Sequence, residues 1–381
     1  MSEMSYLEKL LDGVEVEWLP LGHIAAIKTG QSVNKNMISK NPGVYPVINS
    51  GREPLGFINT WNTDNDPIGI TTRGAGVGSV IWQEGKYFRG NLNYSITIDK
   101  KNHINIRYMY HALLHMKNDI HELCTFDGIP ALNAGSLKKL LIPIPCPDNP
   151  EKSLAIQSEI VRILDKFTAL TAELTAELNM RKKQYNYYRD QLLSFKEGEV
   201  EWKTLGEVAV IGTGNHDTQD AIEHGKYIFY ARGREPLKLN VFDFDETAII
   251  TAGDGAGVGK VFHYAKGKYA LHQRAYRIVP NAFMNPRFVY HYITAYFFTY
   301  IQKASVSSSV TSLRRPMFLK FPIPVPPSEE QARIVEILDK FDTLTNSITE
   351  GLPREIELRQ KQYEYYRDLL FSFPKPETVS N

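Results

Sequence analysis

Two segments of the chain carry apolar residues at alternating steps of four and three, the spacing of one face of an α-helix. They lie within residues 146–202 and 327–381, and each predicts a long helix with a continuous apolar seam. The seam residues are Ile156, Ile160, Ile163, Phe167, Leu170, Leu174, Tyr185, Tyr188 and Leu192 in the first segment, and Ile334, Ile337, Phe341, Leu344, Ile348, Ile356, Tyr363, Tyr366 and Leu370 in the second.

The second helical segment contains two residues that disfavour a continuous helix, Gly351 and Pro353. Proline removes an internal hydrogen bond and clashes with the preceding turn, so we expect a kink or break there. Two long helices in one chain favour an antiparallel, coiled-coil pairing. Such a pair would set two globular blocks apart like the ends of a rod.

The blocks that precede each helical segment have a different pattern, in which short β-branched runs lie between Gly, Pro and Asn clusters. This pattern predicts a mixed α/β (α+β) fold for both blocks. We expect strands at Pro67–Thr72, Ser79–Trp82, Ser95–Ile98 and Thr247–Thr251, and helices at Ile106–Leu123 and Pro286–Lys303.

The two halves of the chain repeat one another, in the same order and at offsets of 174 to 184 residues. Because the repeated segments occur in the same order and at similar offsets, they indicate an internal duplication. The repeated pairs are Val16–Gly30 and Val200–Gly214 (VEW-x-x-LG), Gly51–Leu55 and Gly233–Leu237 (GREPL), Gly74–Gly78 and Gly255–Gly259 (GAGVG), Pro143–Pro145 and Pro322–Pro324, Ile163–Phe167 and Ile337–Phe341 (ILDKF), and Lys183–Phe195 and Lys361–Phe373 (KQYxYYRD).

The duplication predicts two globular domains and three connecting pieces, bounded at 1–19, 20–145, 146–202, 203–326 and 327–381. The N-terminal stretch Tyr6–Trp18 also resembles Tyr188–Trp202, which follows the first long helix. We therefore expect the two chain ends to lie near one another in a circular, pseudo-twofold arrangement.

Charge alternates along these pieces, although the whole chain carries only +1. The two globular blocks carry +5 and +6, whereas the pieces at 1–19, 146–202 and 327–381 carry −4, −2 and −4. Basic blocks between acidic connectors indicate that only the blocks face phosphate.

These features together resemble the specificity (S, HsdS) subunits of type I restriction-modification systems. The helical segments and termini resemble the type IC subfamily in particular, through ILDKF, KQYxYYRD, VEW-x-x-LG and the sequence TAELTAEL at Thr171–Leu178. The two basic blocks correspond to the target recognition domains of that family.

The resemblance implies a non-catalytic, DNA-binding subunit for host defence that recognises a bipartite target in double-stranded DNA. It implies two methyltransferase (HsdM) partners bound through the helices, and restriction (HsdR) subunits joining through the complex. S-adenosylmethionine, ATP and Mg would be used by those partners for adenine-N6 methylation and cleavage, and this chain would hold no cofactor. The chain contains neither the Asn/Asp-Pro-Pro-aromatic motif of amino-methyltransferases nor a GxxxxGK[ST] loop.

The glycine-rich runs Arg73–Gly78 and Gly253–Lys260 depart from nucleotide-binding motifs. A P-loop needs glycine where Asp254 stands and Ser or Thr where Val261 stands, and the runs read GxGxG instead of GxGxxG. Two alternatives remain, a tight turn without a ligand and a loop whose backbone approaches DNA. In the second, Arg73 or Lys260 would contact phosphate or a base edge.

Polar loop side chains are the candidates for DNA contacts. Arg52 and Arg234 belong to the repeated GREPL, and residues shared by two domains that read different half-sites fit a structural or phosphate-binding role better. Unshared residues fit base reading better. The unshared candidates are Asn34, Lys35, Arg89, Asn91 and Asn93 in the first block, and His216, Arg232, His272, Gln273 and Arg274 in the second; the Ser305–Ser312 loop with Arg314 and Arg315 fits either backbone contacts or a mobile surface loop.

The helices carry a second group of candidates, for partner binding and spacing. The tyrosines of KQYxYYRD fit helix packing or methyltransferase contacts better than base stacking. TAELTAEL consists of strong helix formers, and one such unit adds about 6 Å of helix. We hypothesise that its copy number sets the spacer of the target. The residues concerned are Thr171, Leu174, Thr175, Leu178, Tyr185, Tyr188, Arg189, Tyr363, Tyr366 and Arg367.

Other classes of function find little support. Cys124 and Cys146 are too few for a disulfide framework, and His111 and His115 lack the glutamate of an HExxH zinc site, so we expect no metal. No apolar run is long enough for a membrane helix, which favours a cytoplasmic location. The alternatives kept open are a nucleotide-dependent enzyme and a coiled-coil scaffold that does not bind DNA.

Overall fold

The computed structural model describes residues 9–10, 13–51, 53–304 and 312–374. The chain divides into two compact units, unit 1 with Met1–Leu174 and Ile356–Asn381, and unit 2 with Thr175–Glu355. Each unit combines sheets and helices around its own buried apolar residues. The prediction of a mixed α/β chain with two globular parts is confirmed.

The first long helix forms as predicted and is a single element, α7 (Pro150–Leu192), of 43 residues. The side chain of Asn149 caps it by accepting a hydrogen bond of 3.0 Å from a backbone N–H in the first turn. Its seam differs in detail from the predicted one, because Ile163 is only half-buried. The buried apolar residues in the unit 1 part of α7 are Ile156, Ile160 and Leu164.

The second helical segment is broken as expected, into α11 (Ser328–Asn346) and α12 (Gly351–Leu370). Gly351 restarts the chain with a φ of +79°, and a Cβ there would lie 2.4 Å from the carbonyl oxygen of Thr343. Ile348 falls in the break and is 78% exposed, so its assignment to the apolar seam is wrong.

Parts of these helices pack together inside each unit. In unit 1, Phe167 of α7 stacks on Tyr366 of α12 with ring centroids 5.2 Å apart. In unit 2, Tyr188 of α7 stacks on Phe341 of α11 at 5.5 Å. The repeated ILDKF and KQYxYYRD segments thus contact one another in both units, which explains why both are duplicated together.

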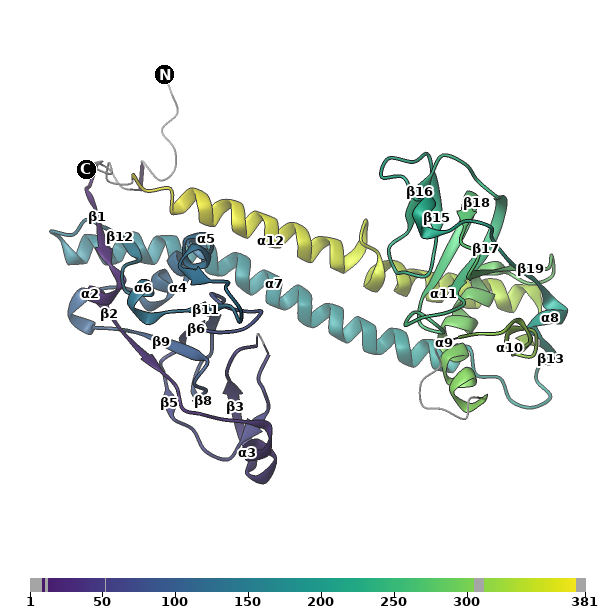
Figure 1. Ribbon diagram of the computed structural model, residues 1–381, viewed down its shortest axis with the longest axis horizontal. Coiled ribbons are helices and arrows are strands. Elements are labelled where there is room, and N and C mark those ends of the chain that lie inside the picture. The colour runs from purple at the N-terminus through teal and green to yellow at the C-terminus, as the bar shows by residue number, and fades with distance from the viewer. Residues whose placement is uncertain (1–8, 11–12, 52, 305–311, 375–381) are drawn as a thin grey trace, which may run out of the picture. The chain divides into compact units, whose positions relative to one another are not determined.

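Unit 1 contains two four-stranded sheets, and α4 and α5 cover one face of the first (Figure 1). The predicted helix at 106–123 is interrupted at Met116, and the predicted strands are present. The first sheet has the order β2 (Ala25–Thr29), β9 (Asn93–Ile98), β6 (Ile68–Thr71), β7 (Val80–Trp82), and the second β4 (Phe57–Ile58), β3 (Pro42–Ile48), β8 (Lys86–Arg89), β5 (Thr63–Asp64); the helices are α2 (Leu21–Ile24), α3 (Lys35–Lys40), η1 (Lys100–Asn102), α4 (Ile106–His115), α5 (Lys117–Glu122) and α6 (Ala134–Leu137), and β10 (Cys124–Thr125) pairs with β11 (Ala131–Leu132).

Unit 2 contains one six-stranded sheet, against which α9 packs through Phe288, Ile293 and Phe297 (Figure 1). The predicted helix at 286–303 and the strand at 247–251 are confirmed. The sheet order is β14 (Ala209–Thr213), β19 (Ala275–Pro280), β17 (Phe244–Ala252), β18 (Phe262–Leu271), β15 (Tyr227–Tyr230), β16 (Leu237–Leu239), and the helices are α8 (Leu205–Val208), η2 (Thr218–Asp220), α9 (Pro286–Ala304) and α10 (Arg315–Leu319).

In each domain an antiparallel pair of strands joins the first segment of the domain to the last, and the two pairs are equivalent. β1 (Val16–Pro20) pairs with β12 (Leu141–Pro145) in unit 1, and β13 (Glu201–Thr204) pairs with β20 (Pro322–Val325) in unit 2. In unit 1 the Trp18 indole N–H also donates to the carbonyl oxygen of Pro374 at 2.8 Å. The segment before the first domain therefore meets the segment after α12, as the expected circular arrangement requires.

Candidate nucleic-acid interface

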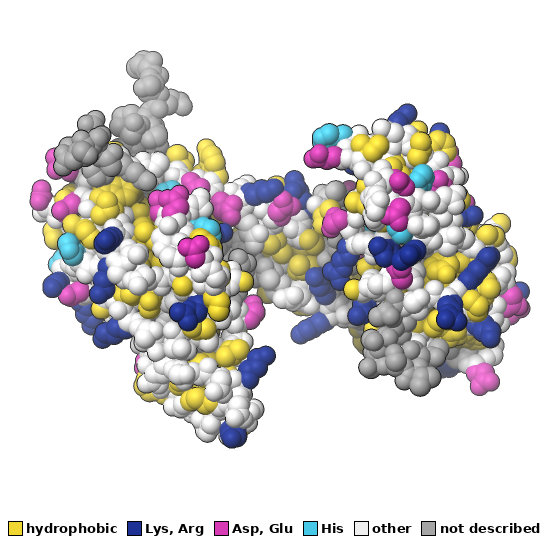
Figure 2. Space-filling model, in the orientation of Figure 1, with side chains coloured by type: hydrophobic (Ala, Val, Ile, Leu, Met, Phe, Trp, Pro, Cys, Tyr) yellow, Lys and Arg dark blue, Asp and Glu magenta, His cyan; other side chains and the backbone are white. Residues whose placement is uncertain are grey.

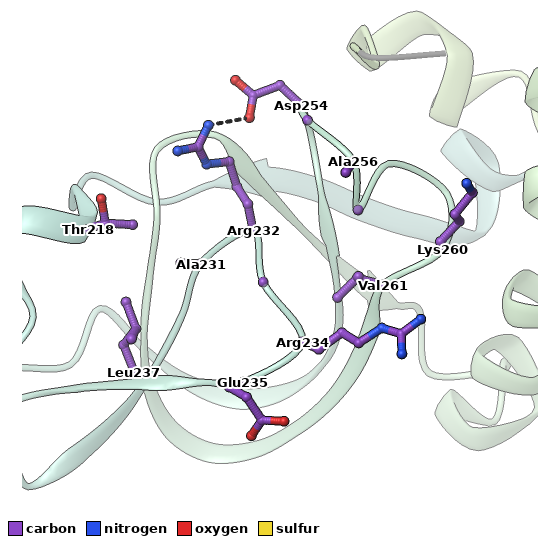
Figure 3. A pocket seen from close by; sticks show the side chains of 13 residues that line it. Thr218, Ala231, Arg232, Arg234, Glu235, Leu237, Asp254, Ala256, Lys260 and Val261 are labelled. Carbon is purple, nitrogen blue, oxygen red and sulfur yellow. Dashed lines mark hydrogen bonds and ion pairs between the residues drawn. The ribbon is translucent and has the colours of Figure 1, made fainter. Parts of the chain in front are cut away.

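In unit 2 the repeated GREPL and glycine-rich segments form two neighbouring loops around one hollow. GREPL joins β15 to β16, and the glycine loop joins β17 to β18. The hollow has a volume of about 760 Å³ and is bordered by Arg232, Arg234 and Lys260. Figure 3 shows Arg232 reaching across to Asp254, while Arg234 and Lys260 extend from the GREPL and glycine loops. The duplicated motifs therefore build one surface, which also carries the carboxylates of Glu235 and Asp254, although they are separate in sequence.

Asp254 lies at the edge of this hollow and binds two arginines. Its Oδ1 accepts a hydrogen bond from Arg232 Nη1 at 2.9 Å, and its Oδ2 accepts one from Arg274 Nη1 at 3.1 Å. Burial acts to raise the pKa of the Asp254 carboxyl, but these hydrogen bonds and the two positive charges outweigh it and hold the pKa below its ordinary value. Asp254 is thus ionised at neutral pH and holds both arginines.

The glycine loops have the geometry of tight turns. Gly74 and Gly78 in unit 1, and Gly255 and Gly259 in unit 2, have φ values between +67° and +91°, a conformation that other residues rarely adopt. Each loop leads into a strand instead of the helix N-terminus that a phosphate-binding loop requires. This geometry contradicts the nucleotide-site alternative and leaves the tight turn and the DNA-approaching loop.

Unit 1 has a smaller hollow of about 390 Å³ on the surface of its own sheets. Lys28, Thr29 and Gln31 border it on the β2 side, and Asn62 and Asp64 border it near β5. It is built from different segments than the hollow of unit 2. No described residue of GREPL or of the glycine loop borders it, so the two hollows are not equivalent sites.

Most of the predicted contact residues lie at the surface. Arg52 and residues 305–311 lie outside the described part of the chain, so their predictions remain untested. His216 and Arg232 are half-buried. The exposed candidates are Asn34, Lys35, Arg73, Asn91, Arg234, Lys260, Gln273, Arg274, Arg314 and Arg315.

Three predicted contact residues are buried instead, Arg89, Asn93 and His272. Arg89 is 3% exposed and donates to the carbonyl oxygens of Asp66 at 2.7 Å and Tyr94 at 3.1 Å. It also hydrogen-bonds to the side chain of Asn93. Arg89 borders the hollow of unit 1, but its hydrogen bonds to Asp66, Asn93 and Tyr94 hold its guanidinium inside the domain, which argues against DNA contact.

His272 holds the turn between β18 and β19. Its Nδ1 accepts a hydrogen bond of 2.8 Å from the backbone N–H of Arg274, and burial lowers its pKa. His272 is only 1% exposed, so it supports the turn and does not reach its surface. His216 is bound nearby, with Nε2 3.0 Å from Asp243 Oδ1.

The sequence patterns do not predict Asp254 as a contact residue, because in them it appears only as a departure from a P-loop. The repeat contains a signal that could have identified it. Asp254 precedes GAGVG in the second half, whereas Arg73 precedes GAGVG in the first. A charge reversal at one position of two otherwise identical loops marks a residue on which the domains differ.

Basic side chains do not form one continuous field on the face of the molecule that Figure 2 shows. On the face in Figure 2, Lys and Arg are interspersed with Asp and Glu over both units. Local clusters such as that around Asp254 therefore carry more information about DNA recognition than net charge does.

The candidate partner residues of the helices differ in exposure. Tyr185 and Tyr363 are partly buried, whereas Tyr188 and Tyr366 are 44% and 40% exposed. The adjacent tyrosines that the sequence interpretation did not select, Tyr187 and Tyr365, are more exposed, at 61% and 66%. Thr171, Leu174, Leu178, Arg189 and Arg367 are partly buried and Thr175 is exposed.

The histidines of α4 serve packing. His111 is fully buried, with Nε2 2.8 Å from Asp165 Oδ1 and Nδ1 2.8 Å from the hydroxyl of Tyr363. Burial lowers the pKa of His111 to about 4, so the ring is neutral at pH 7. His115 Nδ1 lies 2.9 Å from Asp368. Among the described residues, no group of three His, Cys, Asp or Glu is arranged to hold a metal.

No helix in the described part of the chain is long and apolar enough to cross a membrane.

Comparison with known proteins gives a consistent result over the whole chain. The family profile described as the type I restriction modification DNA specificity domain matches residues 13–181 and again residues 197–358. The sequence is 45% identical, over 417 aligned residues that cover both chains completely, to the type I restriction enzyme EcoR124I/EcoR124II specificity subunit of Escherichia coli. It is 36% identical to the EcoprrI specificity subunit of Escherichia coli, covering 92% of this chain and 93% of that relative.

The fold also resembles a solved structure. The crystal structure of the type I restriction-modification system S subunit from M. genitalium matches with a TM-score of 0.67 at 19% identity, covering 98% of this chain and 100% of that one.

Proposed function

Because the chain belongs to the specificity subunits of type I restriction-modification systems, we propose that each of its two domains reads one half of a bipartite, asymmetric DNA target. The domains would extend over residues 20–145 and 203–326. The observation that supports this proposal best is that the two domains share a frame but differ in the loops on it. The strand pairs β1–β12 and β13–β20 are equivalent, whereas the glycine loops carry Arg73 in the first domain and Asp254 in the second.

The DNA contacts in this proposal are the exposed candidates on the loops of each domain. Arg234 and Lys260, beside the unit 2 hollow, are suited to phosphate, because each is exposed and basic and neither is paired with an acidic side chain among the described residues. Asn91 and Gln273 occupy exposed turns before β9 and β19, where amide groups would reach base edges.

The partners in this proposal bind along the helices. The exposed pairs Tyr187–Tyr188 and Tyr365–Tyr366 occur once in each repeat, and each pair has its rings in edge contact. Aromatic side chains beside charged ones, here Arg189 and Arg367, are enriched in protein interfaces. Two equivalent surfaces suit two methyltransferase subunits, through which the restriction subunits would join the complex.

As a specificity subunit, the chain is a non-catalytic part of its enzyme. In this proposal S-adenosylmethionine, ATP and Mg act in the partner subunits. The site of action is the cytoplasm, where host and foreign DNA are both accessible.

The test exchanges one domain. Residues 203–326 are replaced by the corresponding domain of a relative, the chimera is expressed with its methyltransferase partner, and methylated adenines are mapped genome-wide. We expect one half of the motif to change and the other half to remain. A motif changed in both halves, or unchanged, would contradict the proposal, as would the absence of salt-dependent DNA binding by the assembled complex.

A further inference from the structure

Arg73 and Asp254 occupy the same position in the two domains. Backbone pairing establishes this, because Leu132 N donates to the carbonyl oxygen of Thr72 at 2.8 Å and Leu313 N donates to that of Gly253 at 2.8 Å. The next residue forms an isolated antiparallel bridge in both cases, Arg73 with Ala131 and Asp254 with Ser312. The charge reversal therefore falls on equivalent backbone.

The partners of Asp254 are likewise specific to unit 2. Gly76 and Gly257 are equivalent glycines of the two loops. A Cβ on Gly76 would lie 3.0 Å from the carbonyl oxygen of Ser50, and a Cβ on Gly257 would lie 2.7 Å from that of Arg232. Because the same glycine approaches them, Ser50 is the equivalent of Arg232. The β9 and β19 registers likewise make Leu92 the equivalent of Arg274. An Arg–Asp–Arg cluster in one domain thus corresponds to Ser–Arg–Leu in the other.

The cluster leaves hydrogen-bond donors available. Each arginine uses Nη1 to bind a different oxygen of Asp254. The Nη2 and Nε atoms of Arg232 and Arg274 have no hydrogen-bond partner within the part of the chain that the structure describes. Their side chains are 39% and 63% exposed, whereas that of Asp254 is 25% exposed. Both arginine side chains are thus more exposed than the carboxylate that they bind.

The cluster also separates two hollows. Arg232 and Asp254 border the one of about 760 Å³, and Asp254 and Arg274 border a second of about 190 Å³ with Gln273 and Tyr276. The cluster therefore forms a ridge between the two hollows. In a complex, the exposed guanidinium groups of this ridge would enter a groove of the DNA. His272 stiffens the ridge by accepting the Arg274 N–H.

We propose that Arg232 and Arg274 read guanine in the half-site of the second domain, with Asp254 as the positioning residue that orients both. This inference rests on the proposed function and identifies the residues and base by which it operates. Two adjacent donors of one guanidinium match the O6 and N7 acceptors of guanine. A carboxylate that occupies one Nη1 restricts the rotation of the guanidinium and leaves its Nη2–Nε edge for the base.

The test uses the full chain assembled with its methyltransferase partner. Methylation motifs and binding affinities are measured for Arg232→Ala, Arg274→Ala and Asp254→Asn, with duplexes that carry each substitution in the half-site. We expect discrimination at one or two G·C pairs of that half-site to fall by roughly 5- to 150-fold for each arginine variant. We expect Asp254→Asn to lower discrimination at the same G·C pairs. It should not weaken non-specific DNA binding, because the substitution removes a negative charge.

Two controls separate this role from others. Lys266→Ala removes an exposed positive charge from β18, outside both hollows, and leaves the motif unchanged. Arg73→Ala leaves the second half-site unchanged. A general loss of stability would lower affinity for every sequence, which distinguishes a structural role of Asp254 from positioning.

Three results would overturn the inference. The first is a wild-type half-site without a G·C pair, and the second is an unaltered motif in both arginine variants. The third is a uniform loss of affinity with a smaller salt slope, which would make the arginines phosphate contacts. If the wild-type complex gives no bipartite motif, the proposed function itself fails; if it gives one and the variants do not alter it, only the guanine-reading cluster fails.

Discussion

The side-chain oxygen of Gln157 accepts a hydrogen bond of 2.8 Å from the backbone N–H of Asn105, at the start of α4. Gln331 makes the same bond of 2.7 Å to the N–H of Asn285, at the start of α9. Both glutamines are at most 1% exposed. A buried glutamine amide thus joins α7 to α4 in unit 1 and α11 to α9 in unit 2. The same contact is present in both halves of the chain, between elements that are distant in sequence.

Replacing either glutamine by leucine should lower stability. Gln157→Leu keeps the approximate volume but leaves the partly buried Asn105 N–H without its side-chain acceptor, and Gln331→Leu does the same to Asn285. We expect each to lower the free energy of unfolding by about 1–3 kcal/mol, measured by urea denaturation. Gln191→Leu, on the exposed side of α7, is the control and should change it by less than about 0.5 kcal/mol. Equal effects at all three positions would contradict this account.

His111 should make stability depend on pH between about 4 and 6.5. Burial lowers its pKa in the folded chain from the ordinary 6.5 to about 4, so the unfolded chain binds the proton more readily in this range. The stabilisation is complete above pH 6.5 and falls by about 1.4 kcal/mol per pH unit down to about pH 4.

Asp165, its partner, acts in a different pH range. Burial acts to raise the pKa of this carboxyl, but hydrogen bonds from Arg107 and His111 outweigh it and lower the pKa below 3.8. Its contribution is therefore lost only below about pH 4. Urea denaturation of the wild type and His111→Gln at several pH values tests this: the stability difference should shrink between pH 6.5 and 4. A constant difference would refute it.

The glycine loop of unit 2 offers a matched pair of alanine substitutions. Gly255 has a φ of +82° with nothing within 4 Å of an added Cβ, so Gly255→Ala should cost only the backbone strain of about 1–2 kcal/mol. A Cβ on Gly259 would lie 2.5 Å from Cδ1 of the buried Ile301. Gly259→Ala should cost about 1–3 kcal/mol more, by overpacking. Thermal denaturation compares them, and a larger loss for Gly255→Ala would exclude this explanation.

The spacer hypothesis concerns Thr171–Leu178, which lies within the unbroken α7. Inserting a third TAEL after Leu178 adds about 6 Å of helix, or one to two base pairs of DNA at about 3.4 Å each. We expect the unspecified spacer of the methylated motif to lengthen by that amount while both half-sites remain. Thr171→Ala with Thr175→Ala preserves the length and should preserve the spacer. An unchanged motif after the insertion would disprove the hypothesis.

Much of the fold was predictable because local patterns specify it. The 4-3 spacing predicted α7, Gly351 and Pro353 predicted the break before α12, and β-branched runs predicted β6, β7 and β17. Errors arose where packing alone decides burial. Ile348 follows the apolar spacing but falls in the break. Leu164 is buried in the cluster that α7 shares with the domain and with the end of α12, whereas Ile163 is only partly buried against it.

The candidate site was less predictable. Arg89 is a polar residue next to a loop, which favoured a DNA contact, but it is the last residue of β8 and is buried together with Tyr87 and Phe88. The contact of Asp254 with Arg232 and Arg274 could not be predicted from the sequence pattern, because these arginines are 22 and 20 residues away on different loops.

The sequence by itself determined the duplication, the helix positions, the basic blocks and the family resemblance, because each is a local or repeated pattern that does not depend on distant contacts. Only the tertiary structure decided which polar side chains are available to a ligand. Arg89 and Arg274 are the same residue type, yet strand pairing buries one and a turn exposes the other. Exposure and charge pairing depend on segments that meet only after folding.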